Sequence, residues 1–167
     1  MDPTVSCCFT GHRTNRLPWQ DRETDPRCLA LKSRLQAEVE GAYRRGYRHF
    51  LCGMAQGADL YFCEAVLALR DRHPEVTIEA AIPFVDQARR WPEADQLRRE
   101  ALLDRCNYET VVQHHYTTGC MARRNRYMVD RSSLLIAVYD GQPHGGTLNT
   151  LTYAMRQGVE TVILDVE

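Results

Sequence analysis

The sequence predicts an α/β fold: a Rossmann-like, doubly wound and mostly parallel sheet with helices on both faces. Apolar segments of strand length alternate with longer segments of helical periodicity along the whole chain. Loops rich in glycine or basic residues follow several of these strands. Because 167 residues suit one domain with its own core, a single Rossmann-like domain is expected over residues 1–167.

The first half of the chain reads as two strands, each followed by a helix. Residues 5–10 (VSCCFT) and 49–52 (HFLC) are expected to be short buried strands. The helix between them is indicated by apolar residues at near-helical spacing and ends at Gly46. Those apolar residues are Leu29, Leu31, Leu35, Val39, Ala42 and Tyr43. A second helix is expected over residues 58–69, before Pro74.

The second half continues this alternation. Strands are expected over residues 76–82, 109–113, 134–139 and 162–166. Helices are expected over residues 92–105, 120–131 and 147–156. Residues 134–139 (LLIAVY) are almost continuously apolar, which is typical of a strand covered on both faces. The connections between successive strands should therefore be right-handed crossovers.

Composition narrows the function classes. The chain has 21 basic and 22 acidic residues, so nucleic-acid binding would need a local basic patch. No apolar run reaches the roughly 18 residues of a membrane span, and residues 1–10 are too polar for a signal peptide. The seven cysteines include Cys7, Cys8, Cys52 and Cys63 in apolar stretches, which favours free buried thiols in a cytoplasmic protein.

Three loops after strands have the chemistry of a phosphate site. They span residues 10–13, 53–59 and 140–150, and each contains glycine. Glycine lets backbone N–H groups approach an anion, and a helix N-terminus adds roughly 0.3–1 kcal/mol for a nearby negative charge. Parallel sheets bind ligands at the carboxyl ends of their strands, so we expect a nucleotide-type ligand at that edge.

The candidate ligand-binding residues come mainly from these loops. They are Gly11, His12, Arg13, Gly53, Ala55, Gly57, Asp59, Trp91, Arg124, Asn125, Asp140, Gly145, Gly146, Thr147 and Thr150. Arg13 offers a bidentate fork, and Thr147 and Thr150 offer hydroxyl donors. Asp59 either caps backbone N–H groups or contacts ribose hydroxyls. Replacing Gly53 by a bulky residue is expected to abolish binding with the fold intact.

Catalytic candidates are few. Arg124 belongs to a basic cluster with Arg123, Arg126 and Arg131. This cluster is either a solvated surface, or one of its faces, bearing Arg124 and Asn125, contacts the phosphate or ribose of the ligand. Glu64 is a candidate buried acid near the site. Trp91, and less so Trp19, can stack on a base, although covering a hydrophobic edge is the commoner role of such a side chain.

No metal site is expected. His114 and His115, with Cys106 and Cys120, match no standard zinc spacing. Adjacent histidines on a strand would also point to opposite faces of the sheet. A structural or loop role is favoured for these residues.

The motifs resemble those of a known superfamily. Residues 52–59 (CGMAQGAD), followed by a helix rich in Ala and Leu, resemble the glycine loop of the SLOG superfamily, which includes DprA and the Lonely-guy phosphoribohydrolases. Residues 145–150 (GGTLNT) look like its second glycine loop, in a form nearer to DprA. The YpsA-like family is the nearest match, through residues 9–13, 82–84 with Trp91, 121–130 and 136–141. This resemblance implies a Rossmann-like fold and a nucleotide-derived ligand.

One departure bears on activity. Lonely-guy enzymes carry a glutamate just after the second glycine loop, where this sequence has Asn149 and Thr150. Arg124 falls at the position of their arginine. Because glycosidic cleavage calls for a carboxylate, the resemblance disfavours that hydrolysis here.

Three functional hypotheses follow. The first is a sensor or regulatory protein that binds a small nucleotide derivative, such as an NAD- or ADP-ribose-like molecule, with no established cofactor. The second is a nucleotide hydrolase that cleaves an N-glycosidic or phosphate bond. The third, single-stranded nucleic-acid binding as in DprA, is disfavoured by the near-neutral charge and the lack of interleaved aromatic residues. The sequence leaves a homo-oligomer open.

Overall fold

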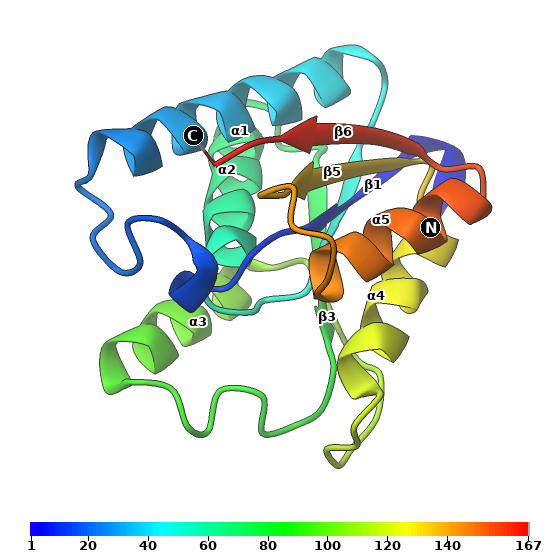
Figure 1. Cartoon of the computed structure of the whole chain (residues 1–167). Coiled ribbons are helices and arrows are strands. Elements are labelled where there is room, and N and C mark those ends of the chain that lie inside the picture. Colours follow the sequence, from blue (N-terminus) through cyan, green and yellow to red (C-terminus); the bar gives the residue numbers. More distant parts are fainter. Residues whose placement is uncertain (167) are drawn as a thin grey trace.

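The computed structural model describes residues 1–166, and its strands form one parallel sheet (Figure 1). The strands are β1 (Ser6–Thr10), β2 (His49–Cys52), β3 (Thr77–Ile82), β4 (Tyr108–Val111), β5 (Leu134–Val138) and β6 (Glu160–Leu164). Their order is β4-β3-β2-β1-β5-β6, and every neighbouring pair is parallel. The Rossmann-like α/β arrangement predicted from the alternation of apolar segments is confirmed.

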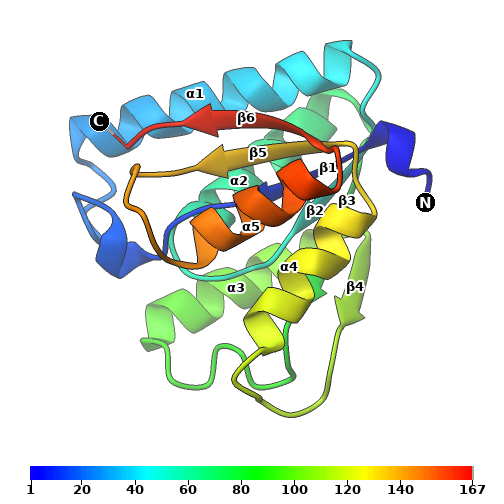
Figure 2. The ribbon, with the colours of Figure 1, turned by 45° about the vertical axis from the view of Figure 1, so that its right-hand side comes forward.

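Helices cover both faces of the sheet. They are α1 (Pro26–Arg44), α2 (Ala58–Arg72), α3 (Glu93–Arg105), α4 (Cys120–Asp130) and α5 (Gly146–Arg156). Figure 2 shows α4 and α5 in front of the sheet and α1 and α2 behind it. α3 packs beside α2.

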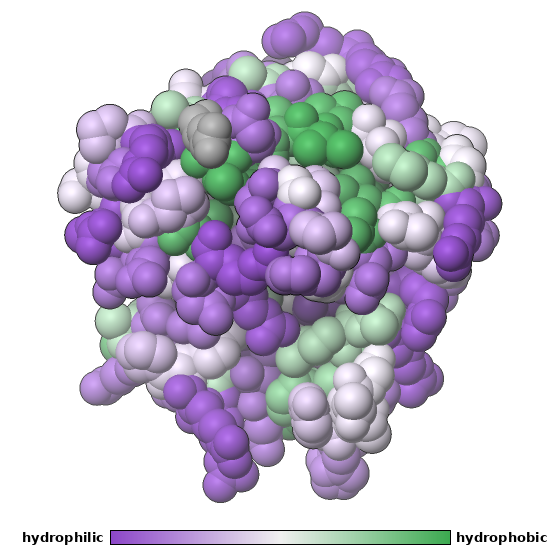
Figure 3. All heavy atoms as spheres, viewed as in Figure 1, coloured by the Kyte–Doolittle hydropathy of each residue, from purple (hydrophilic) through white to green (hydrophobic). Residues whose placement is uncertain are grey.

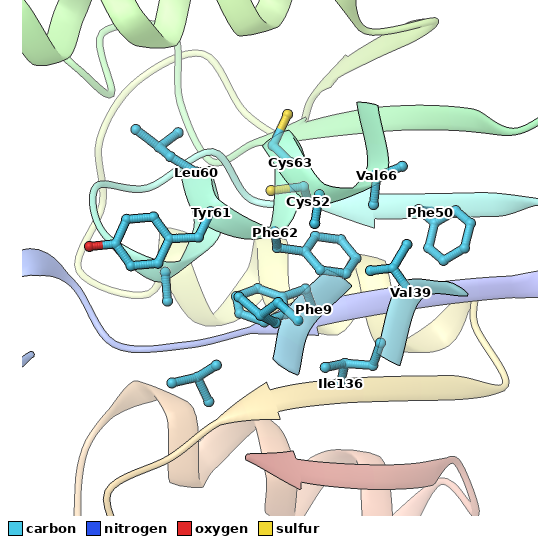
Figure 4. Close-up of a cluster of buried hydrophobic side chains, with 14 of the residues drawn as sticks. Phe9, Val39, Phe50, Cys52, Leu60, Tyr61, Phe62, Cys63, Val66 and Ile136 are labelled. Atoms are coloured by element: carbon cyan, nitrogen blue, oxygen red, sulfur yellow. The ribbon is translucent and has the colours of Figure 1, made fainter. Parts of the chain in front are cut away.

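The alternation of side chains along β1 divides the core into two layers. Cys7 and Phe9 point into the larger cluster, with α1 and α2, whereas Cys8 points into the smaller one under α4 and α5. Phe9 stacks on Phe62 of α2 with ring centroids 4.6 Å apart (Figure 4). Each such buried side chain stabilises the fold by roughly 1.5–3 kcal/mol. The cysteines are free and, apart from half-buried Cys106, buried, as predicted.

The first helix starts earlier than its apolar pattern indicated. Pro26 is its first residue, and the Asp25 side chain accepts a hydrogen bond from the amide of Arg27. Leu29, expected on the apolar stripe, is 55% exposed. The stripe instead runs through Cys28, Leu31 and Leu35, which are three or four residues apart and share one face, whereas Leu29 lies two residues before Leu31 and points away from that face.

The observed strand bounds differ most from the predicted ones in the two edge strands of the sheet. β6 spans Glu160–Leu164 rather than residues 162–166, because its register pairs Leu134 with Glu160. β4 spans Tyr108–Val111 rather than residues 109–113 and is largely exposed, as befits an edge strand. Both edge strands lack the continuous apolar pattern that marks β5, so the sequence locates them less sharply.

The surface is predominantly polar. Figure 3 shows mostly hydrophilic residues in the view of Figure 1, with hydrophobic residues gathered over β5 and β6. There, Ile163 is 50% exposed. Within residues 1–166, no helix combines the length and apolar character needed to cross a membrane.

The strand order reverses next to β1. The chain moves from β1 outward to β4 and then returns to place β5 on the other side of β1. The loops after β1 and β5 therefore lie beside each other at the carboxyl edge of the sheet (Figure 1). Ligands of doubly wound sheets bind at this kind of reversal.

Candidate functional site

A cavity of about 290 Å³ opens at this reversal of strand order. It is lined by the end of β1 and its following loop, by the loop after β2, and by the first turns of α4 and α5. Its residues are Phe9, Thr10, Gly11, His12, Arg13, Asn15, Arg16, Ala55, Asp59, Met121, Arg124, Asn125, Gly146 and Thr147. The three glycine-containing loops thus meet at one place, and we call this space the central cavity.

Most of the loop residues singled out in the sequence line the central cavity. They are Gly11, His12, Arg13, Ala55, Asp59, Arg124, Asn125, Gly146 and Thr147. Asn15 and Arg16 were missed, although the loop after β1 was known to be polar. Phe9, Thr10 and Met121 lie in motifs that the sequence analysis recognised, so a signal for them was present.

Two guanidinium groups come from the loop after β1. Arg13 is exposed, and within residues 1–166 its side chain has no recorded hydrogen bond or ion pair. The Arg16 guanidinium lies 3.0 Å from Asp140 of the loop after β5. Asp140, a predicted ligand contact, does not line the cavity but fixes Arg16 at its wall. Of these two arginines, Arg13 is therefore the one left available to an incoming anion.

Arg124 supplies a third, buried guanidinium from α4. Its Nη1 donates to the carbonyl oxygens of Gly53 and, at 3.2 Å, Ala81, and its Nε donates to Asn125 Oδ1 at 2.8 Å. Burial lowers the pKa of Arg124, and the nearby Asp59 carboxylate acts in the opposite direction. Arg124 forms no salt bridge among the described residues, so its charge is only partly compensated.

Asp59 brings the carboxylate of the central cavity. Its side chain is almost fully buried and accepts a hydrogen bond from the Ala55 amide at 3.0 Å. It binds the loop before α2 rather than capping that helix, whose N-cap is Gly57. Burial raises the pKa of Asp59, and Arg124 counteracts part of that rise.

His12 joins the loops after β1 and β5. Its Nε2 accepts a hydrogen bond from the Asp140 amide at 2.9 Å, which requires a ring nitrogen without a proton. Burial lowers the pKa of His12, consistent with this neutral form. Its Nδ1 lies 3.5 Å from the Thr147 hydroxyl. His12 is thus held as a structural link as well as a cavity wall.

The N-terminus of α5 points its free amides at the cavity edge. Gly145 precedes the helix with φ +106°, and the amides of Gly146 and Thr147 have no recorded acceptor within residues 1–166. The Thr150 hydroxyl, expected to serve a ligand, instead donates to the Gly146 carbonyl at 2.9 Å. The groups at this helix start that could serve an anion are therefore the backbone amides and the Thr147 hydroxyl.

Comparison with known proteins gives the family of this chain. The YpsA family model, described as the YspA SLOG family, matches residues 7–164. The chain belongs to the YpsA family of SLOG proteins. The resemblance seen in the sequence motifs is thereby confirmed.

Relatives of this chain occur in Bacillus subtilis. The uncharacterized SPbeta prophage-derived protein YoqJ of Bacillus subtilis is 30% identical over 145 residues, covering 79% of this chain and 84% of YoqJ. The UPF0398 protein YpsA of the same species is 27% identical, covering 70% of this chain and 63% of YpsA.

A solved structure shares the fold of this YpsA-family chain. DNA processing protein A (DprA) from Helicobacter pylori, described for its single-stranded DNA binding mode, superposes with a TM-score of 0.61 at 15% identity. The match covers 97% of this chain and 65% of that DprA chain, so the chain spans less than two thirds of this relative. At this identity the likeness concerns the fold.

Two glycines of the loop after β2 lie close against neighbouring protein groups. A Cβ on Gly53 would lie 2.5 Å from Arg124 Nη1, and one on Gly57 would lie 2.8 Å from the His12 carbonyl. Gly57 also has φ +87°. Neither lines the central cavity. A bulky residue at Gly53 would have to displace the buried Arg124 guanidinium, so the expectation that the fold stays intact remains a prediction, and this contact argues against it.

Three other predicted residues of the YpsA-family chain lie away from the cavity. Glu64 is partly exposed and pairs with Arg98 at 2.6 Å, so it is no acid of this site. Trp91 lines a separate cavity between the loops after β3 and β4. Trp19 is fully buried and donates to the Tyr61 hydroxyl at 3.1 Å, so it cannot stack on a ligand.

His114 and His115 lie in a loop, the kind of position that the sequence favoured for them. They follow β4 in a loop, and their rings lie side by side with centroids 4.4 Å apart rather than on opposite faces of a strand. Across residues 1–166, no three His, Cys, Asp or Glu side chains are grouped closely enough to hold a metal ion.

Proposed function

We propose that this YpsA-family protein binds a small nucleotide derivative whose phosphate occupies the central cavity, and that it acts as a sensor or regulator. One observation carries the proposal: Arg13, Arg124 and the free amides that begin α5 face one cavity. Guanidinium groups and helix N-termini are the protein groups best suited to a phosphate. Asp59, in the same cavity, is placed to accept hydrogen bonds from sugar hydroxyls.

Calorimetry with a panel of ligands tests the proposal. The panel comprises AMP, ADP-ribose, NAD and ribose 5-phosphate, and we expect micromolar binding of at least one. Arg13→Ala should weaken that binding by about tenfold to a hundredfold, because it removes one charge-assisted contact worth roughly 1.5–3 kcal/mol. Arg22→Ala is the matched control, since Arg22 is also exposed but lines no described cavity. If no member of the panel binds or stabilises the protein, the proposal is wrong.

A second candidate function is nucleotide hydrolysis. Asp59 and Arg124 share the cavity, and burial raises the pKa of Asp59. A carboxyl group of this kind suits N-glycosidic cleavage, in which water replaces the base at the anomeric carbon and the departing nitrogen takes up a proton. Against it, the first turn of α5 carries no acidic residue.

Chromatography of AMP and NAD after incubation with the protein separates this candidate from simple binding. Hydrolysis predicts a released base, lost in Asp59→Asn and in Arg124→Ala. Binding without any product, in a protein that calorimetry shows to be loaded, rules hydrolysis out.

The third candidate, single-stranded nucleic-acid binding, draws on the separate cavity that Trp91 lines. Phe84 and Tyr116 lie there with Trp91, next to Arg89 and Arg90. Aromatic and basic side chains together suit single strands. A gel shift that weakens steeply with salt and is lost in Trp91→Ala would support it. The absence of any shift at low salt would exclude it.

A further inference from the structure

A second cavity continues the central cavity between α4 and α5. It measures about 260 Å³ and shares Met121, Asn125 and Gly146 with the central cavity, so the two are contiguous. Ligand sites usually measure roughly 300–1,000 Å³, a range that the joined cavities reach and neither reaches alone. A ligand anchored in the central cavity therefore has a direct path into this α4–α5 cavity.

The α4–α5 cavity differs chemically from the central cavity. Its remaining residues are Thr118, Ala122, Arg126, Asn149, Thr150 and Tyr153. Arg126 is its only arginine, whereas Arg13, Arg16 and Arg124 surround the central cavity. Apolar walls come from Met121, Ala122 and the ring of Tyr153. A flat group with polar edges suits this space better than a second phosphate does.

Two asparagines and a fixed aromatic ring define the edges of the α4–α5 cavity. The Tyr153 hydroxyl donates to Asp130 at 2.6 Å, which holds the ring in place. Asn125 Oδ1 accepts from Arg124, leaving its amide NH₂ to donate to a ligand. Asn149 is exposed, and no hydrogen bond of its side chain is recorded within residues 1–166. An asparagine amide pairs well with the adjacent donor and acceptor of a nucleobase edge.

We infer that the α4–α5 cavity receives the heteroaromatic base of the bound nucleotide, with Asn125 and Asn149 contacting its polar edge. This inference rests on the proposed anchoring of the phosphate in the central cavity. It assigns base recognition to α4 and α5, and phosphate recognition to the loop after β1 and the backbone of α5.

The test compares ribose 5-phosphate with the four common nucleoside 5′-monophosphates by calorimetry. At least one monophosphate should bind tenfold or more tightly than ribose 5-phosphate. Ala122→Trp, an exposed position on α4, should fill the cavity and bring that affinity down to the value for ribose 5-phosphate. Asn149→Ala should weaken the monophosphate at least fivefold. Neither variant should change binding of ribose 5-phosphate.

Ala101→Trp provides the matched control, because Ala101 is exposed on α3 and lines neither cavity. It should leave every affinity unchanged. The inference is overturned if the base adds nothing to the affinity, or if its contribution persists in both Ala122→Trp and Asn149→Ala. If no compound binds, ribose 5-phosphate included, the proposed phosphate site is overturned instead, and this inference with it.

Discussion

Replacing Gly53 by alanine should destabilise the protein through Arg124. The backbone of Gly53 does not have the positive φ that would strain an alanine. Its new Cβ would, however, lie 2.5 Å from Nη1 and 2.6 Å from Cζ of Arg124. Since real Cβ contacts are longer, the guanidinium has to move, and its bonds to the Gly53 and Ala81 carbonyl oxygens are lost.

The size of this destabilisation follows from the two hydrogen bonds that Arg124 Nη1 donates to the carbonyl oxygens of Gly53 and Ala81. Hydrogen bonds to charged groups contribute about 1.5–3 kcal/mol each, and the displaced guanidinium recovers part of this by entering the central cavity and meeting water. We expect Gly53→Ala to lower the free energy of unfolding by about 2–4 kcal/mol. Gly119→Ala is the control, because its Cβ would have nothing within 4 Å. That control should change stability by no more than about 1 kcal/mol.

Urea denaturation of a double-mutant cycle identifies the mechanism. In the Arg124→Ala background the guanidinium is absent, so adding Gly53→Ala should cost almost nothing further. A Gly53→Ala variant as stable as the wild type would refute the reasoning. So would strictly additive effects of the two substitutions, because they would show that Arg124 is not what the new methyl group displaces.

Three further predictions concern Glu79, Cys106 and Gly145. Burial raises the pKa of Glu79, but hydrogen bonds outweigh it and hold the value at about 2, below the ordinary 4.5; the donors are His49, Tyr127 and Thr110. Because the folded-state pKa is lowered, the stabilisation is complete above pH 4.5 and is lost as the pH falls toward 2. Between pH 7 and pH 3, the free energy of unfolding measured by urea titration should therefore fall by about 2 kcal/mol more for the wild type than for Glu79→Gln. A hydrogen bond from Cys63 lowers the pKa of half-buried Cys106, so iodoacetamide should alkylate Cys106 before the other thiols, as peptide mass spectrometry will show; uniform labelling would contradict this. Gly145→Ala should cost about 1–3 kcal/mol in thermal unfolding because Gly145 has φ +106°, whereas Gly146→Ala should change little; equal effects would disprove the backbone argument.

The fold was largely predictable because a strand that is buried on both faces of the sheet has an almost continuously apolar sequence. Residues 134–138 are apolar without interruption, and β5 lies where they indicated. β4 has exposed residues at most of its positions, so its ends could not be fixed by hydrophobicity. Leu29 shows the limit for helices: it is apolar, but it lies two residues from Leu31, so the two side chains cannot share a face and Leu29 is exposed.

For the candidate site, the sequence could predict mainly those residues that lie in loops directly after strands. The parallel topology brings the ends of β1, β2 and β5 to one edge, which is why Arg13 and Gly146 meet. The position of Arg16 depends on its pairing with Asp140, 124 residues away, for which no local pattern exists. Glu64 failed as a candidate because α2 is buried over most of its surface, so the sequence did not reveal its one partly exposed side.

The central position of β1 has a consequence for how the protein folds. One of its edges can pair with β2 as soon as residues 49–51 are available, but the other waits for residues 134–137. The half built from β1 to β4 can therefore assemble first, and pairing with β5 closes a loop of more than a hundred residues, a slow kind of step. Because α4 and α5 complete the cavity wall, a ligand bound as proposed in the central cavity would stabilise the assembled molecule against undocking of β5 and β6 as well as against global unfolding.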